Sequence, residues 1–119
     1  MDIKSLVKRL EEAREASRDI DFEIGPIAGY LALDPPIHRK WTWKFPSGEV
    51  GYLPTFTGSL QAAYELSQLI HPDDVCGVTW EPGRATAQVG TARHEAFEPA
   101  IALCASILSE LLNKRPDLG

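Results

Sequence analysis

The sequence predicts an α+β fold in which one antiparallel four-stranded sheet, made of two hairpins, is packed by three main helices in the order αββαββα. Two observations carry this prediction. Apolar residues recur at helical spacing in three separated stretches, and two other stretches alternate polar and apolar residues around turn-forming residues. The 119 residues, 44% of them hydrophobic, fit a single domain over 1–119 with one core.

The first helix is predicted over residues 3–17, behind Asp2 as the N-cap. Its apolar positions follow helical spacing, and its other face is densely charged, as on a solvated helix surface. A second, shorter helix is expected to start at Asp19 or Asp21 and to run through Leu31. Glycine and proline residues inside that stretch make the second helix irregular.

A first hairpin is predicted after the helix-breaking run Asp34-Pro35-Pro36. Residues 41–45 alternate aromatic and polar side chains with the period of a half-buried strand. Pro46-Ser47-Gly48 forms the turn, and residues 49–53 return as the second strand.

A helix is predicted over residues 59–70, capped by Thr57 or Ser59 and ended by His71-Pro72. The second hairpin follows, with strands at 75–81 and 85–89 joined through Pro82-Gly83. The closing helix begins at Pro99 and is so apolar through residue 112 that we expect it to be central in the core.

The composition narrows the function classes. A net charge of −5 disfavours binding to long nucleic acids, because a phosphate backbone attracts clustered Lys and Arg. No apolar run reaches the roughly 20 residues of a membrane span, and a charged amphipathic segment stands where a signal peptide would be, so we expect a cytoplasmic protein without membrane contact. Cys76 and Cys104 fit buried apolar positions better than a metal site.

Three segments, residues 6–20, 52–69 and 99–108, resemble the small phage and prophage proteins that have an ABA sandwich domain. The shared motifs are a T-x-S-L-x-A-A helix start and a P-A-x-A-L-C-A closing helix. Where such proteins have a threonine before the final proline, this chain has Glu98, so a hydroxyl cap is lost. The resemblance implies a phage or prophage origin and an accessory role in the bacterial host cytoplasm.

Aromatic and basic residues around both hairpins are suited to a nucleotide, because bases stack on aromatic rings while Arg, Lys and helix N-termini bind phosphates. The expected ligand-binding residues are Arg39, Lys40, Trp41, Trp43, Lys44, Tyr52, Phe56, Thr57, Ser59, Trp80, Arg84, Arg93 and His94. The same residues have a structural alternative, in which the strand aromatics are core and the hydroxyls are helix caps.

The leading hypothesis, by analogy, is a homo-oligomeric protein that binds and sequesters a small anionic nucleotide-derived signal of host antiviral defence. The alternative is a protein-interaction module that docks a host or phage protein through exposed aromatic surface. We expect no catalysis, cofactor or metal. His94 with Glu95 and Glu98, and His71 with two aspartates, have the ordinary positions of helix-start and turn residues.

Overall fold

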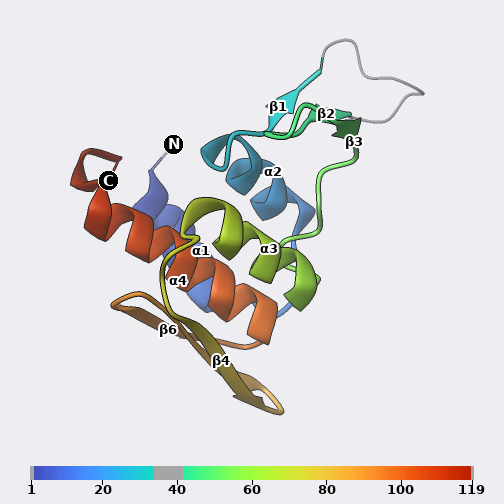
Figure 1. Cartoon of the computed structure of the whole chain (residues 1–119). Helices are drawn as coiled ribbons and strands as arrows, with labels where there is room; N and C mark the ends of the chain where they lie inside the picture. The colour runs from blue at the N-terminus through green and yellow to red at the C-terminus, as the bar shows by residue number, and fades with distance from the viewer. Residues whose placement is uncertain (1, 34–41, 119) are drawn as a thin grey trace.

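The computed structural model describes residues 2–33 and 42–118, and its elements are traced in Figure 1. The helices are α1 (Ile3–Glu12), α2 (Arg18–Ile27), α3 (Leu60–Ile70) and α4 (Pro99–Lys114), with a last 3₁₀ turn at Pro116–Leu118. The strands are β1 (Leu31–Ala32), β2 (Trp43–Lys44), β3 (Val50–Gly51), β4 (Cys76–Glu81), β5 (Arg84–Val89) and β6 (Ala92–Ala96).

These strands form two separate antiparallel sheets, so the expected single four-stranded sheet with three helices is wrong. The small sheet has the order β1-β2-β3 and the large sheet the order β4-β5-β6, and four helices accompany them in the described residues. Each predicted hairpin is present and gains one more strand, β1 or β6. The two sheets lie at opposite ends of the molecule (Figure 1).

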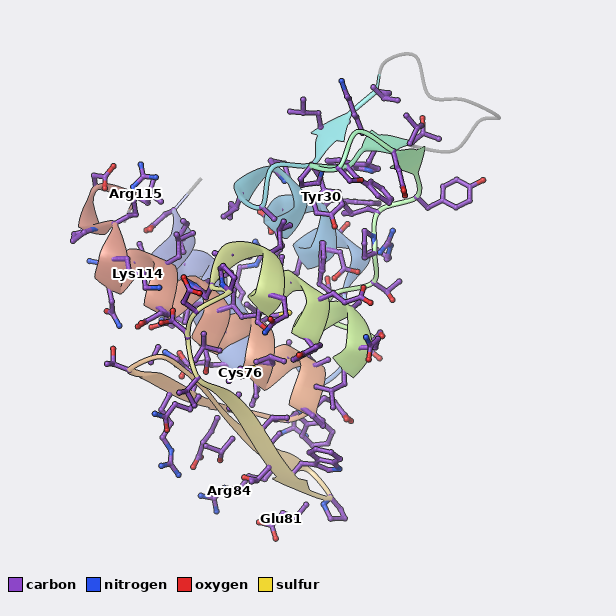
Figure 2. The ribbon with its side chains drawn as sticks, in the orientation of Figure 1. Tyr30, Cys76, Glu81, Arg84, Lys114 and Arg115 are labelled. Carbon is purple, nitrogen blue, oxygen red and sulfur yellow. The ribbon has the colours of Figure 1, made fainter. Side chains whose placement is uncertain are left out.

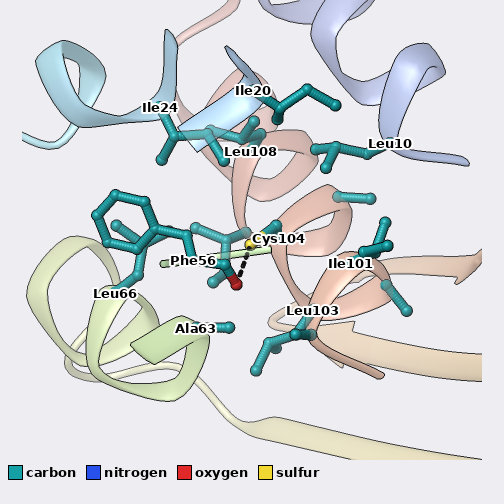
Figure 3. Packing of buried hydrophobic residues seen from close by; sticks show 14 of the residues in the cluster. Leu10, Ile20, Ile24, Phe56, Ala63, Leu66, Ile101, Leu103, Cys104 and Leu108 are labelled. Carbon is teal, nitrogen blue, oxygen red and sulfur yellow. Dashed lines mark hydrogen bonds between the residues drawn. The ribbon is translucent and has the colours of Figure 1, made fainter. Parts of the chain in front are cut away.

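The closing helix α4 is the centre of the core, as expected. Every side chain from Ala100 to Leu108 is buried, and α4 packs against α1, α3, β5 and β6. Beneath it, the large sheet presents mainly alanines, which let the helix approach closely enough for Ser106 Oγ to donate to the main-chain oxygen of Ala87 at 2.8 Å. Figure 3 shows Leu10, Ile24 and other apolar side chains closing around this helix.

The predicted first helix is shorter than expected, because α1 ends at Glu12 and Ser17 begins the next helix instead. Ser17 has extended backbone geometry, and its hydroxyl accepts a hydrogen bond from the Ile20 amide at 3.2 Å. A side-chain cap of this kind satisfies a helix-start amide that has no acceptor within the helix. The helical spacing through residue 17 therefore spans two helices.

The second helix stops before Leu31, contrary to the expectation. Gly29 adopts φ +98°, a left-handed conformation that ends helices and that residues with a side chain rarely adopt. The chain then extends into β1, whose Leu31 lies opposite Lys44 of β2. The predicted break at Asp34-Pro35-Pro36 lies outside the described residues.

The third strand of the large sheet, β6, follows a tight turn at Gly90, which has φ +59°. A side chain at this position would collide with Glu110 of α4, because a Cβ there would lie 2.1 Å from its carboxylate oxygen. The helix predicted at 59–70 and the hairpin predicted at 75–89 are present as α3 and β4-β5. None of the described helices has the length and apolar character needed to cross a membrane.

Candidate functional site

The expected ligand residues of the first hairpin that the structure describes differ in exposure. Trp43 is only 6% exposed and stacks on Phe22 of α2 with ring centroids 6.0 Å apart. Its Nε1 is buried without a hydrogen-bond partner in the structure described. Lys44 and Tyr52 are exposed, whereas Arg39, Lys40 and Trp41 lie outside the described residues.

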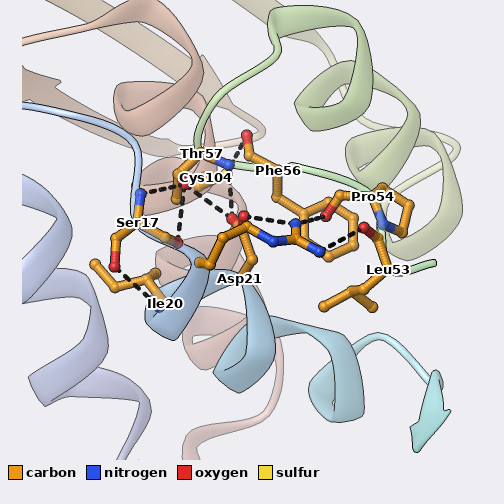
Figure 4. Close-up of polar contacts among 9 residues, drawn as sticks. Ser17, Ile20, Asp21, Leu53, Pro54, Phe56, Thr57 and Cys104 are labelled. Atoms are coloured by element: carbon orange, nitrogen blue, oxygen red, sulfur yellow. Dashed lines mark hydrogen bonds and ion pairs between the residues drawn. The ribbon is translucent and has the colours of Figure 1, made fainter. Parts of the chain in front are cut away.

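Phe56, Thr57 and Ser59 have structural roles. Phe56 is buried, and the Thr57 amide and hydroxyl both donate to Oδ1 of buried Asp21, at 2.9 and 2.8 Å. The Thr57 hydroxyl also accepts from the Ser17 amide at 2.9 Å, as Figure 4 shows. Ser59 caps α3 by accepting from the Ala62 amide at 3.1 Å. These groups already have partners, but only Ser59 is the helix cap that the structural alternative expected, because the Thr57 hydroxyl joins Ser17 and Asp21 instead.

Arg18 completes the network around Asp21. Its guanidinium donates to Asp21 Oδ2 at 2.9 Å and to the main-chain oxygens of Leu53 and Pro54 at 2.9 and 3.1 Å (Figure 4). Both carboxylate oxygens of the buried aspartate are therefore hydrogen-bonded, which offsets the cost of burying the charge. This network attaches α2 to the segment between β3 and α3.

The thiol of Cys104 lies in the same region but is not suited to nucleophilic chemistry. It is fully buried, and its sulfur donates to the main-chain oxygen of Phe56 at 3.4 Å. Burial, with a smaller contribution from the charge of Asp21, raises the pKa of Cys104 far above the ordinary value. A thiolate is the nucleophilic form, and here the thiol remains protonated. The other cysteine, Cys76, is half-buried.

The expected ligand residues of the second hairpin lie on two faces of the large sheet. The strand register places Trp80 and His94 on the side that faces α4, and Arg84 and Arg93 on the outer side. Arg84 donates to Glu95 at 2.7 Å. Trp43 and Lys44, the expected ligand residues that lie in described strands of the first hairpin, belong to the small sheet, so the structure does not bring them together with these four residues.

His71, which the sequence indicates as a turn residue, is buried beside α4. Its Nε2 lies 2.9 Å from the main-chain oxygen of Ile107, which can only accept, so Nε2 is the donor in this contact. Its Nδ1 lies 3.3 Å from Lys114 Nζ, and Lys114 also pairs with Asp74. These contacts tie the end of α3 to α4. Over residues 2–33 and 42–118, no three His, Cys, Asp or Glu side chains gather as metal ligands.

An open surface lies instead at the β4 edge of the large sheet. Natural sheets protect their edges with charges, proline or a covering element. The β6 edge has Arg93 and Glu95, and α1 lies against β6, where His94 Nδ1 is 3.3 Å from Glu11. Residues 75–80 contain neither charge nor proline, and Val75 and Trp80 are 76% and 60% exposed.

The main-chain groups along this edge alternate in direction. The oxygen of Val75 accepts from Gly90 on the β5 side at 2.9 Å. Because successive residues of a strand point their amide and carbonyl to opposite sides, the main-chain groups of Cys76, Val78 and Trp80 point away from β5. Within the described part of the chain, β4 pairs with β5 alone. This row of donors and acceptors can therefore receive another strand.

Two depressions flank the β4 edge, one on each face of the sheet. The outer one, about 280 Å³, includes Val75, Thr79 and Arg93 in its lining. The inner one, about 420 Å³, lies between β4 and α3 and includes Leu60, Tyr64 and Cys76. Gly77 and Val78 line both depressions, and a Cβ added to Gly77 would meet no described atom within 4 Å.

Figure 2 shows Cys76 close to the helices and Glu81 at the far tip of the hairpin, so the β4 edge extends from the core into open surface. The aromatic surface of the alternative hypothesis is thus partly present, at Trp80 and at Tyr64, which is 47% exposed. The sequence pointed to Trp80 as a contact residue but did not point to Val75 or Tyr64. The signal that was present is the run of residues 75–80, which lacks the charges typical of a protected edge.

Comparisons of the chain with models of protein families, with curated proteins and with solved structures found no match. The resemblance to phage ABA sandwich proteins therefore stays a prediction.

Proposed function

We propose that this protein is a non-catalytic interaction module that binds an extended polypeptide segment along the β4 edge. The binding mode is strand addition, in which main-chain hydrogen bonds give affinity and pockets for alternate side chains give specificity. Following the phage resemblance, we place this activity in the cytoplasm of a bacterial host.

One observation carries the proposal: the outward main-chain groups of Cys76, Val78 and Trp80 lie between two depressions on opposite faces of the sheet. A strand laid along β4 would project successive side chains alternately toward the two faces on which these depressions lie. A nucleotide has no main chain with which to satisfy this row of donors and acceptors.

Nucleotide sequestration, the leading hypothesis from the sequence, receives less support. Among the described residues expected to converge, Trp43 and Lys44 belong to the small sheet, whereas Trp80, Arg84, Arg93 and His94 belong to the large sheet. The hydroxyls of Thr57 and Ser59 are occupied by structural hydrogen bonds. Native mass spectrometry with a panel of cyclic nucleotides and ADP-ribose derivatives tests that hypothesis directly. Tight binding of an intact nucleotide would favour sequestration over the interaction module.

The interaction module is tested by photo-crosslinking from a light-activated amino acid placed at Thr79 in one variant and at Glu95 in another. Both side chains lie on the outer face of the large sheet, but Thr79 is on the β4 edge and Glu95 on β6. We expect polypeptide adducts from position 79 in cells that express the protein, and none from position 95. Equal adducts from both positions, or none from position 79, would contradict the proposal.

A further inference from the structure

We infer that the strand received at the β4 edge is β4 of a second copy of this chain, paired antiparallel about a two-fold axis at Val78. The inference rests on the proposed function and names its partner. It would join the large sheets of two copies into one continuous sheet, in an interface where the same patch serves both copies.

The main-chain geometry is self-complementary in this register. Val78 lies opposite Val78 of the second copy, and Cys76 opposite its Trp80. The outward amides and carbonyls belong to these three residues, so each one finds a partner in the other copy.

The side chains match as well. Cys76, Val78 and Trp80 lie on the face of the sheet that is turned toward α4, and in the paired register they meet the same three residues again. Gly77 meets Thr79 on the outer face. Glu81 lies opposite Val75 rather than opposite its own equivalent, so the register opposes no like charges across the strand pair.

Trp80 gives the strongest reason to choose a second copy over an unrelated segment. Its indole is 60% exposed and would lie across from Cys76 of the second copy, which lines the inner depression of about 420 Å³ together with Leu60 and Tyr64. The symmetry places the second copy's indole in the equivalent position. One surface thus supplies both the projecting side chain and the recess, so two copies can bury both at once.

The pairing is expected to be reversible. A fully buried aromatic side chain removes roughly 150–250 Å² of surface from water. One strand together with Trp80 and Tyr64 therefore buries less than the roughly 800 Å² per partner that is typical of a stable protein interface. Interfaces at the small end of the range are weak, so we expect dissociation in the micromolar range.

Sedimentation equilibrium over a concentration series tests the dimer. Wild-type protein is expected to approach twice its monomer mass of 13.1 kDa at concentrations of about 100 μM. Trp80→Ala is expected to weaken association at least about tenfold, as truncation of a central interface aromatic does. Leu69→Ala, which shortens an exposed apolar side chain of α3 that lines neither depression, is the matched control and is expected to leave association unchanged.

A second variant separates main-chain pairing from simple apolar contact. Val78→Pro removes an amide that points away from β5, so the large sheet keeps its own hydrogen bonds while the edge loses a donor. We expect this variant to remain monomeric with an unchanged circular dichroism spectrum. A folded Val78→Pro protein that dimerises like the wild type would overturn the inference.

Disulfide trapping tests the register. In a Cys76→Ala background, Val78→Cys places two cysteines on the two-fold axis with Cα atoms about 5.5 Å apart, the usual spacing of a disulfide. Thr79→Cys is the control, because the Cα atoms of residue 79 in the two copies would lie about 8 Å apart, too far for an unstrained disulfide. Oxidation is expected to link the Val78→Cys variant into a dimer and to leave Thr79→Cys mainly unlinked, and the reverse pattern would overturn the register.

The failure of this inference is distinguishable from failure of the proposed function. Suppose that the wild-type protein stays monomeric at about 100 μM while position 79 crosslinks to a different polypeptide. That result would refute the pairing of two copies but leave the proposed interaction module intact. A monomer without any adduct refutes both.

Discussion

The two sheets of this molecule are built from similar hairpins but reach very different sizes. Strands of the large sheet run for five or six residues beneath α4, whereas those of the small sheet run for two. The large sheet buries Ala85, Ala87 and Val89 almost completely, while Leu31 and Val50 of the small sheet are 62% and 55% exposed. The difference teaches that a covering helix, more than strand propensity, determines how far a hairpin extends in this chain.

The small sheet is held mainly through its aromatic side chains. Trp43 stacks on Phe22, and Tyr30 lies edge-on to Phe45 and Phe56 with centroids 5.1 and 5.8 Å away. The few main-chain pairs between its strands contribute little by comparison. We therefore expect the large sheet to determine global stability and the small sheet to open more readily.

The largest effect is expected from truncation in the core around α4, where Figure 3 shows Leu108 beside Ile20 and Ile24. Leu108→Ala removes a fully buried side chain of α4 and leaves a cavity, at a cost of about 2–5 kcal/mol in the free energy of unfolding. Urea denaturation followed by circular dichroism measures it. Loss of less than about 0.5 kcal/mol would show that α4 is not the shared core of the molecule.

A smaller loss is expected where the small-sheet region is attached to the rest. Asp21→Asn replaces the buried carboxylate that accepts from Arg18 with an amide. We expect the free energy of unfolding to fall by about 1–3 kcal/mol. Asp19→Asn, an exposed carboxylate in the same helix turn, is the control. Equal urea midpoints for the two variants would mean that the buried network contributes nothing to the attachment.

The pH dependence of stability is expected to report on the contact between α4 and the turn that leads into β6. Burial alone would raise the pKa of Glu110, but hydrogen bonds from Asn113 and Thr91 outweigh it and lower the pKa below the ordinary 4.5. Because the pKa is depressed in the folded state, this stabilisation is fully present above pH 4.5 and is lost as the pH falls through the folded value. Glu110→Gln is expected to have a flatter stability profile between pH 6 and pH 3 in urea melts, and an unchanged slope would contradict this prediction.

The smallest effect is expected on the outer face of the small sheet. Val50→Ala shortens a side chain that is already 55% exposed, so the free energy of unfolding is expected to change by less than about 0.5 kcal/mol. Hydrogen exchange gives a finer test, with the strand amides of β2 and β3 exchanging faster than those of β5. Equal protection in both sheets would mean that they unfold as one unit.

Strong local signals predicted the elements of the core. The helix at 60–70 has a serine cap and clear apolar spacing, and the closing helix has a proline start and an almost continuous apolar run. The hairpin of β4 and β5 has alternating alanines and a Pro-Gly turn. In these segments the local preference agrees with the burial that the fold requires.

The missed elements lack such signals. The two residues of β1 are too few to show an alternating pattern. The strand β6 reads Ala-Arg-His-Glu-Ala, and its three polar residues in a row give no sign that the two alanines are buried. Sheet membership also depends on which hairpins meet in space, a tertiary property. For the same reason, a sequence can suggest Trp80 as a contact residue without indicating that its strand lies at an edge.

The alanines beneath α4 set the thickness of the molecule. Ala85, Ala87 and Ala96 occupy the layer between helix and sheet, and the 2.8 Å contact from Ser106 to the Ala87 carbonyl fixes how near the two surfaces lie. Close-packed interiors do not absorb an added methyl group without displacement. Over evolutionary time, we therefore expect side-chain volume in this layer to stay nearly constant.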